Sequence, residues 1–92
     1  MVPDSETLRR SFHERGYSFD IFVDPPGRKW IGFVHAVDEI VVPLQGSVTI
    51  RVGGKTHRPA LGEEVFIPAG AVHDVITSPD SGSRWAYGYR QR

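Results

Sequence analysis

The sequence predicts an all-β domain, a barrel or sandwich of short antiparallel strands, preceded by one short helix. Three observations predict this class. Apolar and polar residues alternate with a period of two through much of the chain after Gly16. Ten glycines and seven prolines are spread between the apolar runs, as in short strands joined by turns. The chain has 92 residues and no internal repeat, which is the size of a single domain.

The composition argues against several classes of function. Eleven basic and eleven acidic residues cancel, so electrostatics gives no reason to expect nucleic acid or an anionic membrane as a partner. The absence of cysteine excludes disulfides, thiolate metal sites and cysteine nucleophiles. The N-terminus lacks the apolar segment of a secretory signal, and no apolar run is long enough to cross a bilayer. We therefore expect a cytoplasmic protein.

Residues 1–16 are expected to form an N-terminal helix that packs on the barrel, and residues 17–92 to form the barrel itself. Asp4 or Ser5 can cap the helix. Leu8 and Phe12 are four residues apart and would share one apolar face. Gly16 suits the position just after the last helical turn.

The rest of the chain predicts eight short strands separated by turn signals. The strongest of these signals is Gly53-Gly54, a two-residue hairpin turn between an alternating apolar strand and a polar return strand. The predicted strands span residues 17–23, 30–37, 40–44, 48–52, 55–58, 64–67, 72–77 and 84–89.

Two segments carry the candidate functional residues. The first is FVHAVDEIVVPLQG, residues 33–46, and the second is GEEVFIPAGAVHDVIT, residues 62–77. Together they resemble the paired motifs of the cupin superfamily, which implies a cupin-type antiparallel β-barrel (a double-stranded β-helix, or jelly roll). The matching residues are His35, Glu39 and Gly46 in the first motif, and Gly62, Pro68, Gly70 and His73 in the second.

The resemblance implies one divalent metal ion held by His35, Glu39 and His73. Two imidazoles and a carboxylate suit Fe, Mn, Ni, Zn or Cu. Three protein ligands leave room for water or a chelating substrate. Pro68 and Gly70 would form a corner that points His73 into the barrel beside His35.

The chain departs from the family motifs at two places. Phe33 stands where the family has its first histidine, and Thr77 where it has an asparagine. Phe33 should then face the barrel lumen and make the site drier and smaller.

Other readings of these residues remain open. The histidines could be hydrogen-bonded core residues, and Glu39 could instead pair with Arg28 or Lys29. Asp38 and Gln45 are candidates for a substitute ligand or for a partner that hydrogen-bonds to a ligand. Asp38 directly precedes Glu39 and would most simply face the other way.

Aromatic residues near the C-terminus predict the wall of a ligand pocket. Trp85, Tyr87 and Tyr89 alternate along one strand and share a face, which together with Phe33 would bind a flat or apolar molecule. The alternative is that these rings fill the core or form a dimer contact.

The functional hypothesis is a small cupin with a mononuclear metal site that acts on or binds a small organic molecule. A dioxygenase, a decarboxylase and an isomerase are the enzyme types considered. The alternatives are a non-catalytic module that senses or binds a metal or metabolite, and a metal-free structural barrel. We also expect a homodimer, because a barrel this small exposes strand edges that need cover.

Overall fold

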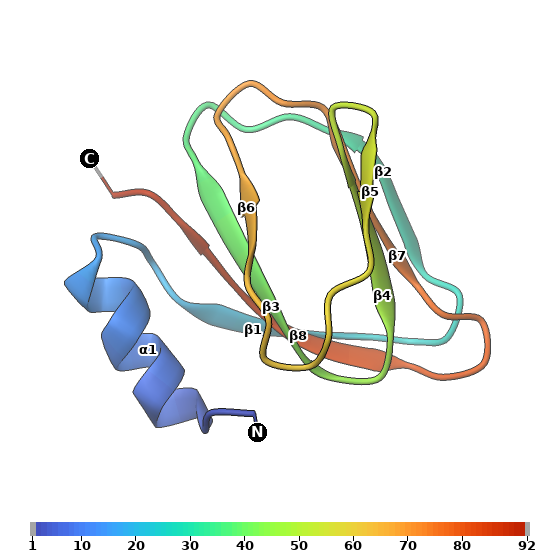
Figure 1. Ribbon diagram of the computed structural model, residues 1–92, viewed down its shortest axis with the longest axis horizontal. Coiled ribbons are helices and arrows are strands. Elements are labelled where there is room, and N and C mark those ends of the chain that lie inside the picture. The colour runs from blue at the N-terminus through green and yellow to red at the C-terminus, as the bar shows by residue number, and fades with distance from the viewer. Residues whose placement is uncertain (1, 92) are drawn as a thin grey trace.

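The computed structural model describes residues 2–91 as one helix and eight strands in two facing sheets (Figure 1). The four-stranded antiparallel sheets have the orders β1-β8-β3-β6 and β2-β7-β4-β5. The fold is therefore an antiparallel β-barrel with a short N-terminal helix, which confirms the predicted class. The elements are α1 (Ser5–Glu14), β1 (Asp20–Asp24), β2 (Lys29–Phe33), β3 (Glu39–Gln45), β4 (Val48–Val52), β5 (Lys55–His57), β6 (Val65–Ile67), β7 (His73–Thr77) and β8 (Ser83–Tyr89).

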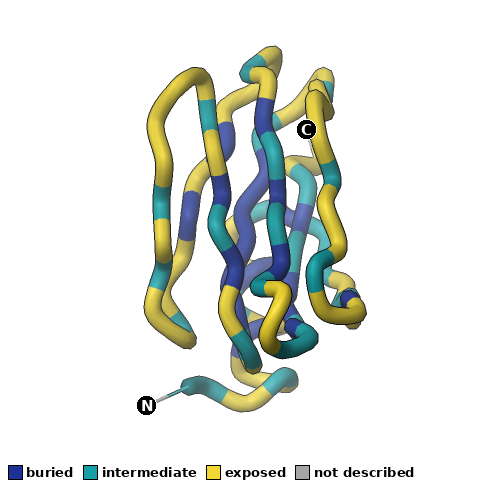
Figure 2. Tube along the Cα trace, turned by 90° about the vertical axis from the view of Figure 1, so that its right-hand side faces the viewer, coloured by how far each residue is buried: buried dark blue, intermediate teal, exposed yellow. Residues whose placement is uncertain are grey.

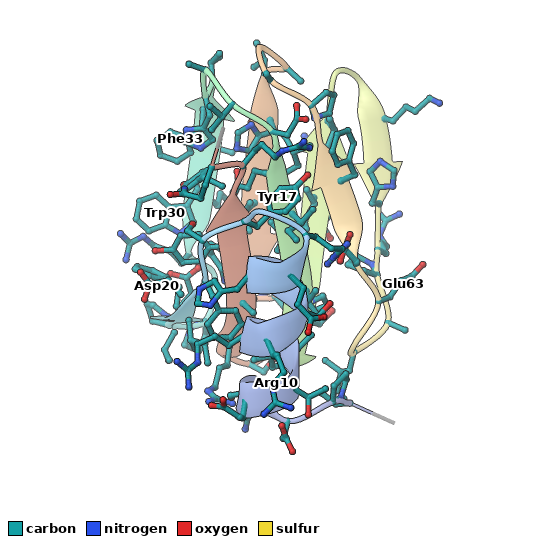
Figure 3. The ribbon with its side chains drawn as sticks, turned by 90° about the vertical axis from the view of Figure 1, so that its left-hand side faces the viewer. Arg10, Tyr17, Asp20, Trp30, Phe33 and Glu63 are labelled. Atoms are coloured by element: carbon teal, nitrogen blue, oxygen red, sulfur yellow. The ribbon has the colours of Figure 1, made fainter. Side chains whose placement is uncertain are left out.

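Helix α1 covers the outer face of the β1-β8-β3-β6 sheet (Figure 3). It begins after Asp4, whose side chain accepts a hydrogen bond from the backbone N–H of Thr7 at 2.8 Å. Leu8 and Phe12 are its buried residues, and they pack against residues of β3 and β8. The helix can approach closely because Gly88 has no side chain: a Cβ there would lie 2.8 Å from the Phe12 ring. Within residues 2–91, no helix has both the length and the apolar character needed to cross a membrane.

The main core lies between the two sheets. Buried residues alternate with more exposed ones along several strands, and the turns are mostly exposed (Figure 2). This alternation places one face of each sheet in the interior. The buried residues of this core are Val41, Val48, Ile50, Val65, Ile67, Val75 and Trp85.

Strand β1 differs from its prediction in its start and in the face it turns inward. It begins at Asp20, and Tyr17 forms only an isolated bridge with Arg90. The alternating apolar residues of this segment lie on the side of α1, where Tyr17 and Ile21 join the helix cluster. Beyond the helix, Val23 is left 68% exposed. The opposite face, with Phe22, therefore lines the interior.

Strand β2 ends at Phe33 instead of continuing to residue 37, and it contains an irregularity between Trp30 and Phe33. Gly32 adopts φ 72°, and its N–H donates to Asp74 Oδ1 at 2.8 Å. Residues three apart on a regular strand face opposite sides, but this bulge turns both Trp30 and Phe33 inward. Ile31 is 57% exposed.

The Gly53-Gly54 hairpin is confirmed. Both glycines have positive φ, 54° and 91°, as a tight two-residue turn requires. The turn joins β4 to β5 in register, with Val52 opposite Lys55.

Candidate functional site

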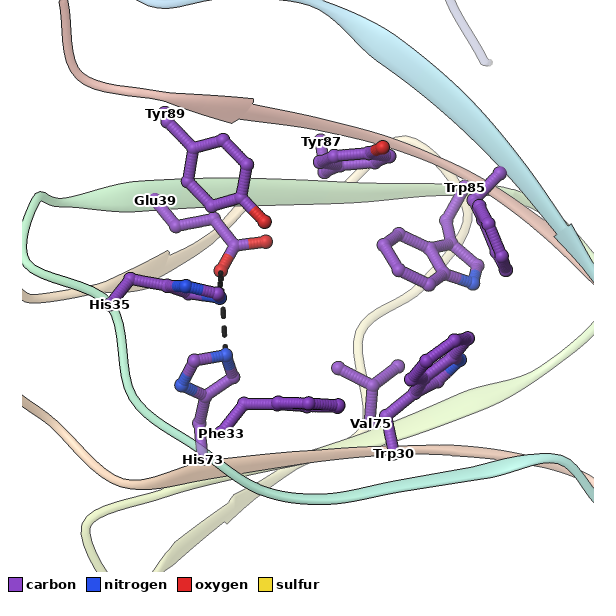
Figure 4. Close-up of a pocket in the computed structure, with 10 residues that line it drawn as sticks. Trp30, Phe33, His35, Glu39, His73, Val75, Trp85, Tyr87 and Tyr89 are labelled. Carbon is purple, nitrogen blue, oxygen red and sulfur yellow. Dashed lines mark ion pairs between the residues drawn. The ribbon is translucent and has the colours of Figure 1, made fainter.

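A cavity of about 260 Å³ lies between the two sheets and is lined mainly by aromatic side chains (Figure 4). Its walls come from both sheets and from the loop that joins β2 to β3. The lining residues are Phe22, Trp30, Phe33, His35, Glu39, His73, Val75, Trp85, Tyr87 and Tyr89.

His35, Glu39 and His73 meet at one end of this cavity. Glu39 is the first residue of β3 and His73 the first residue of β7, while His35 lies in the loop before β3. The Nε2 atoms of His35 and His73 each lie 3.4 Å from Glu39 Oε1. One donor atom from each residue falls within 4.8 Å of the others. One loop and two strands, one from each sheet, thus bring together the three side chains that the motifs single out.

The Pro68–Gly70 corner is attached to the segment that carries the site. The Gly70 N–H donates to the carbonyl oxygen of His35 at 2.9 Å, and the Ala69 N–H donates to Asp38 Oδ1 at 2.8 Å. The Pro68–Gly70 corner therefore has two roles. It directs the chain into β7, and its backbone N–H groups hold the loop that carries His35. Asp38 bonds to this corner and does not join the cluster of ligating atoms.

One carboxyl oxygen of Glu39, Oε1, is buried without a hydrogen-bond partner among the described residues. Glu39 as a whole is only 4% exposed. Burial raises the pKa of Glu39 to about 7. Burial, followed by the nearby His73, lowers the pKa of His35. Near neutral pH the site therefore favours a neutral His35 and leaves the Glu39 carboxyl poised between its two forms.

The tautomer of His73 follows from its backbone neighbour. Its Nδ1 lies 3.2 Å from the carbonyl oxygen of Ala71. A carbonyl can only accept, so Nδ1 carries the proton and Nε2 presents its lone pair toward Glu39. A lone pair and a carboxylate oxygen facing each other require a proton or a cation between them.

The donor set fits a divalent transition metal. Two ligands at about 2.1 Å from a tetrahedral ion lie about 3.4 Å apart. Both His Nε2 atoms have this separation, 3.4 Å, from Glu39 Oε1. Phe33 closes the side where the cupin motif has another histidine, with its ring centroid 6.4 Å from each imidazole.

Two alternatives considered from the sequence are not realised. Glu39 does not pair with Arg28, whose guanidinium lies 4.2 Å from the Trp30 ring centroid, nor with Lys29, which is exposed. The expectation that Gln45 supports the site is wrong. Gln45 is exposed at the opposite end of β3, next to Arg84 of β8.

The aromatic residues of β8 line the same cavity. Trp85, Tyr87 and Tyr89 share the inward face of the strand, as the alternation predicts, and Trp85 also belongs to the core between the sheets. The Tyr89 ring packs edge-on against His35 with 4.9 Å between centroids. Burial raises the pKa of Tyr89 to about 12, so its hydroxyl stays protonated.

Sequence reasoning missed Asp24, which lies at the far end of the cavity from Glu39. This residue is 1% exposed, and its carboxylate accepts hydrogen bonds from the indole N–H groups of Trp30 and Trp85. Phe22, on the same face of β1, was missed because the apolar alternation pointed to the opposite face. One signal for Asp24 existed: a buried indole needs an acceptor, and the chain has two tryptophans.

Sequence comparisons do not assign this chain to a group. No family model matches it, and no curated protein matches it significantly.

Solved structures match the fold well at low sequence identity. A cupin-2 domain protein from Rhodospirillum rubrum, Rru_A2000, is 19% identical with a TM-score of 0.75, over 84% of this chain and 52% of that one. The plu4264 protein from Photorhabdus luminescens is 18% identical with a TM-score of 0.74, over 84% and 64% of the two chains. The polyketide cyclase RemF from Streptomyces resistomycificus is 24% identical with a TM-score of 0.69, over 79% and 53%.

The chain spans less than two thirds of each of these three proteins. At these identities the likeness concerns the fold and not the activity. The chain is a small β-barrel with the cupin fold.

Proposed function

We propose that this chain binds one divalent transition-metal ion through His35, Glu39 and His73, and binds or acts on a small organic molecule in the adjoining cavity. The observation that carries the proposal is the buried Glu39 Oε1, which lacks a hydrogen-bond partner and faces two imidazole nitrogens at 3.4 Å. A native fold rarely leaves such an atom unpaired unless a bound group completes it.

The residues around the cluster would prepare it for an organic ligand. A bound Fe, Mn, Ni, Zn or Cu ion would polarise an oxygen of that ligand or of a water molecule. The carbonyl of Ala71 accepts from His73 Nδ1 and would so leave the Nε2 lone pair of His73 free to hold a bound ion. Phe33 leaves one side of the cluster apolar, so less water surrounds the reacting end of the ligand.

The cavity favours a molecule with a flat apolar body and an oxygen-bearing end. Polar groups converge at the cluster, while most of the other lining side chains are aromatic. The cavity volume of about 260 Å³ lies just below the usual range for small-molecule sites, so the ligand should be small. A dioxygenase, decarboxylase or isomerase reaction would suit such a site. The same contacts would also serve a non-catalytic binding protein.

The proposal is tested by metal titration of protein purified without added metal. Calorimetric titration with Zn²⁺ should give one site per chain, and Glu39→Gln should weaken it at least about a hundredfold, because the buried charge is lost. Glu14→Gln is the matched control, since Glu14 lies exposed on α1. No binding by the unaltered chain, or equal binding by both variants, would overturn the metal site.

A further inference from the structure

Asp24 is a buried carboxylate that the proposed metal site does not use. Its Oδ2 accepts the indole N–H of Trp30 at 3.0 Å and that of Trp85 at 3.2 Å. Its Oδ1 lies 3.2 Å from the same Trp30 nitrogen. These bonds join β1 to β8 of its own sheet and to β2 of the facing sheet, so they hold both indoles at the end of the cavity away from Glu39.

The bonds to Asp24 remove the only polar atoms that the two indoles possess. An indole has a single N–H donor and no acceptor. With both donors engaged, Trp30 and Trp85 present only ring carbon to the cavity. The floor of the cavity is defined here as Phe22, Trp30, Val75 and Trp85, and no side chain in it has a free hydrogen-bonding atom.

The floor is also held in place by ring packing. Phe22 packs against both indoles, with centroid distances of 5.5 Å to Trp30 and 5.6 Å to Trp85. The guanidinium of Arg28 lies 4.2 Å from the Trp30 ring centroid. Rotation of either indole to offer its N–H to a ligand would break these contacts and remove one of the two donors that stabilise the buried Asp24 charge.

We propose that Asp24 is a positioning residue that sets the ligand specificity of this cavity. By engaging both indole N–H groups, it makes the floor accept the unsubstituted hydrocarbon end of a flat molecule and reject an end that carries a hydroxyl or carbonyl. An oxygen at the other end of the molecule faces His35, Glu39 and His73. This inference rests on the proposed function only in that the cavity holds a small organic molecule, and it requires no metal.

The experiment compares two probes on metal-free protein in the presence of a chelator. The probe 2-naphthol has one hydroxyl, which can face Glu39. In naphthalene-2,6-diol the hydroxyls are at opposite ends, so one must face the floor. The unaltered chain should bind 2-naphthol at least about tenfold more tightly than the diol, because burying an unpaired hydroxyl is costly.

Two variants should reduce the ratio of the two dissociation constants, diol over 2-naphthol, to about threefold or less. In Asp24→Ala no side-chain acceptor remains for either indole, so an N–H is released and can bond to the diol. In Trp30→Phe the Asp24 carboxylate survives with spare accepting capacity, and the diol can donate to it. Asp80→Asn, an exposed aspartate in a turn, is the control and should keep the original ratio.

A second readout separates this role from a merely structural one. The chain has two tryptophans, so proton–nitrogen correlation spectra should show two indole N–H signals, and Asp24→Ala should shift both of them. If Asp24 only supports the fold, both probes should weaken by the same factor and their ratio should not change.

Three results would overturn the inference. These are equal binding of both probes by the unaltered chain, no binding of 2-naphthol at all, and an unchanged ratio in both variants. Because metal is excluded, a failed Zn²⁺ titration would contradict the metal site and leave this ratio unaffected.

Discussion

A buried carboxylate lies near each end of the cavity, and the two groups have opposite surroundings: Glu39 lines the cavity, whereas Asp24 is bonded to the two lining indoles. Asp24 is 1% exposed and accepts hydrogen bonds from two indoles. Glu39 is 4% exposed, yet its Oε1 has no hydrogen-bond partner among the described residues. In Figure 4 the cluster around Glu39 and the two indoles lie at opposite sides of the view.

The difference separates a carboxylate that completes the fold from one kept for binding. Burial of a charge is costly unless hydrogen bonds or an opposite charge compensate it. Asp24 receives that compensation from the protein, so it costs little in the folded state. Glu39 does not, so the fold holds it in a state that a proton or a cation stabilises. We infer that the free energy lost at Glu39 is recovered when the site is filled.

The sharpest test of this comparison is the stability of metal-free protein after each carboxylate is removed. Asp24→Ala should lower the free energy of unfolding by about 2–4 kcal/mol, because it leaves two buried indole N–H groups unpaired. Glu39→Gln should raise that free energy by about 1–2 kcal/mol at about pH 8, because it removes an uncompensated charge. Urea denaturation measures both. Destabilisation by similar amounts would remove the distinction between the two ends.

The second test is the pH dependence of the same free energy. The pKa of Glu39 is raised from 4.5 to about 7, so over this window the folded chain holds a proton that the unfolded chain releases. The metal-free protein should therefore lose about 1–3 kcal/mol of stability as the pH rises from about 4.5 to about 7.

His35 acts in the opposite direction and must be separated from Glu39. Its pKa is lowered from 6.5, so its protonation below that pH destabilises the fold. The difference between the unaltered chain and Glu39→Gln isolates the Glu39 contribution. If the two denaturation series run parallel over the whole pH window, Glu39 does not carry the shifted proton. Zn²⁺ binding should weaken as the pH falls towards about 6, since the imidazoles must be neutral to bind.

A smaller effect on metal affinity is expected from changing Phe33, the apolar residue beside His35, Glu39 and His73. Phe33→His should place a further imidazole beside His35 and His73 and tighten Zn²⁺ binding by about tenfold. It should also weaken the binding of 2-naphthol, which loses an aromatic wall. Ile31→His is the matched control on the same strand, because Ile31 is 57% exposed and does not line the cavity. Unchanged Zn²⁺ affinity in Phe33→His would mean that residue 33 does not reach the ion.

The last prediction concerns the oligomeric state and the exposed apolar residues of the surface. Several exposed apolar residues lie on β2, in the loop after it, or just before β7, among them Ile31, Val34, Val37 and Val72. We predict a homodimer that covers part of this surface or the free edges of β1 and β2. Helix α1 is less available for such a contact, because Leu8 and Phe12 pack on its own sheet. Light scattering at micromolar concentration should give twice the mass of the chain, and a monomer would contradict this prediction.

Features that depend on local chemistry could be predicted from the order of the residues. The Asp4 cap, the Gly53-Gly54 hairpin and the Pro68–Gly70 corner follow from backbone preferences that each residue carries wherever it stands. The alternation in β8 fixed which rings share a face. The spacing of His35, Glu39 and His73 was readable because it belongs to a recurrent pair of motifs.

The tertiary structure alone decided which distant residues meet and which face of a strand turns inward. The bulge at Gly32 brings Trp30 to the same side as Phe33. Helix α1 packs on the apolar face of β1, so the opposite face of this strand, with Asp24, points into the barrel. Gln45 was misplaced because nearness to Glu39 in the sequence does not mean nearness along an extended strand. The physical reason is that these contacts depend on strand register and on packing between elements far apart in the chain, and no local period records either.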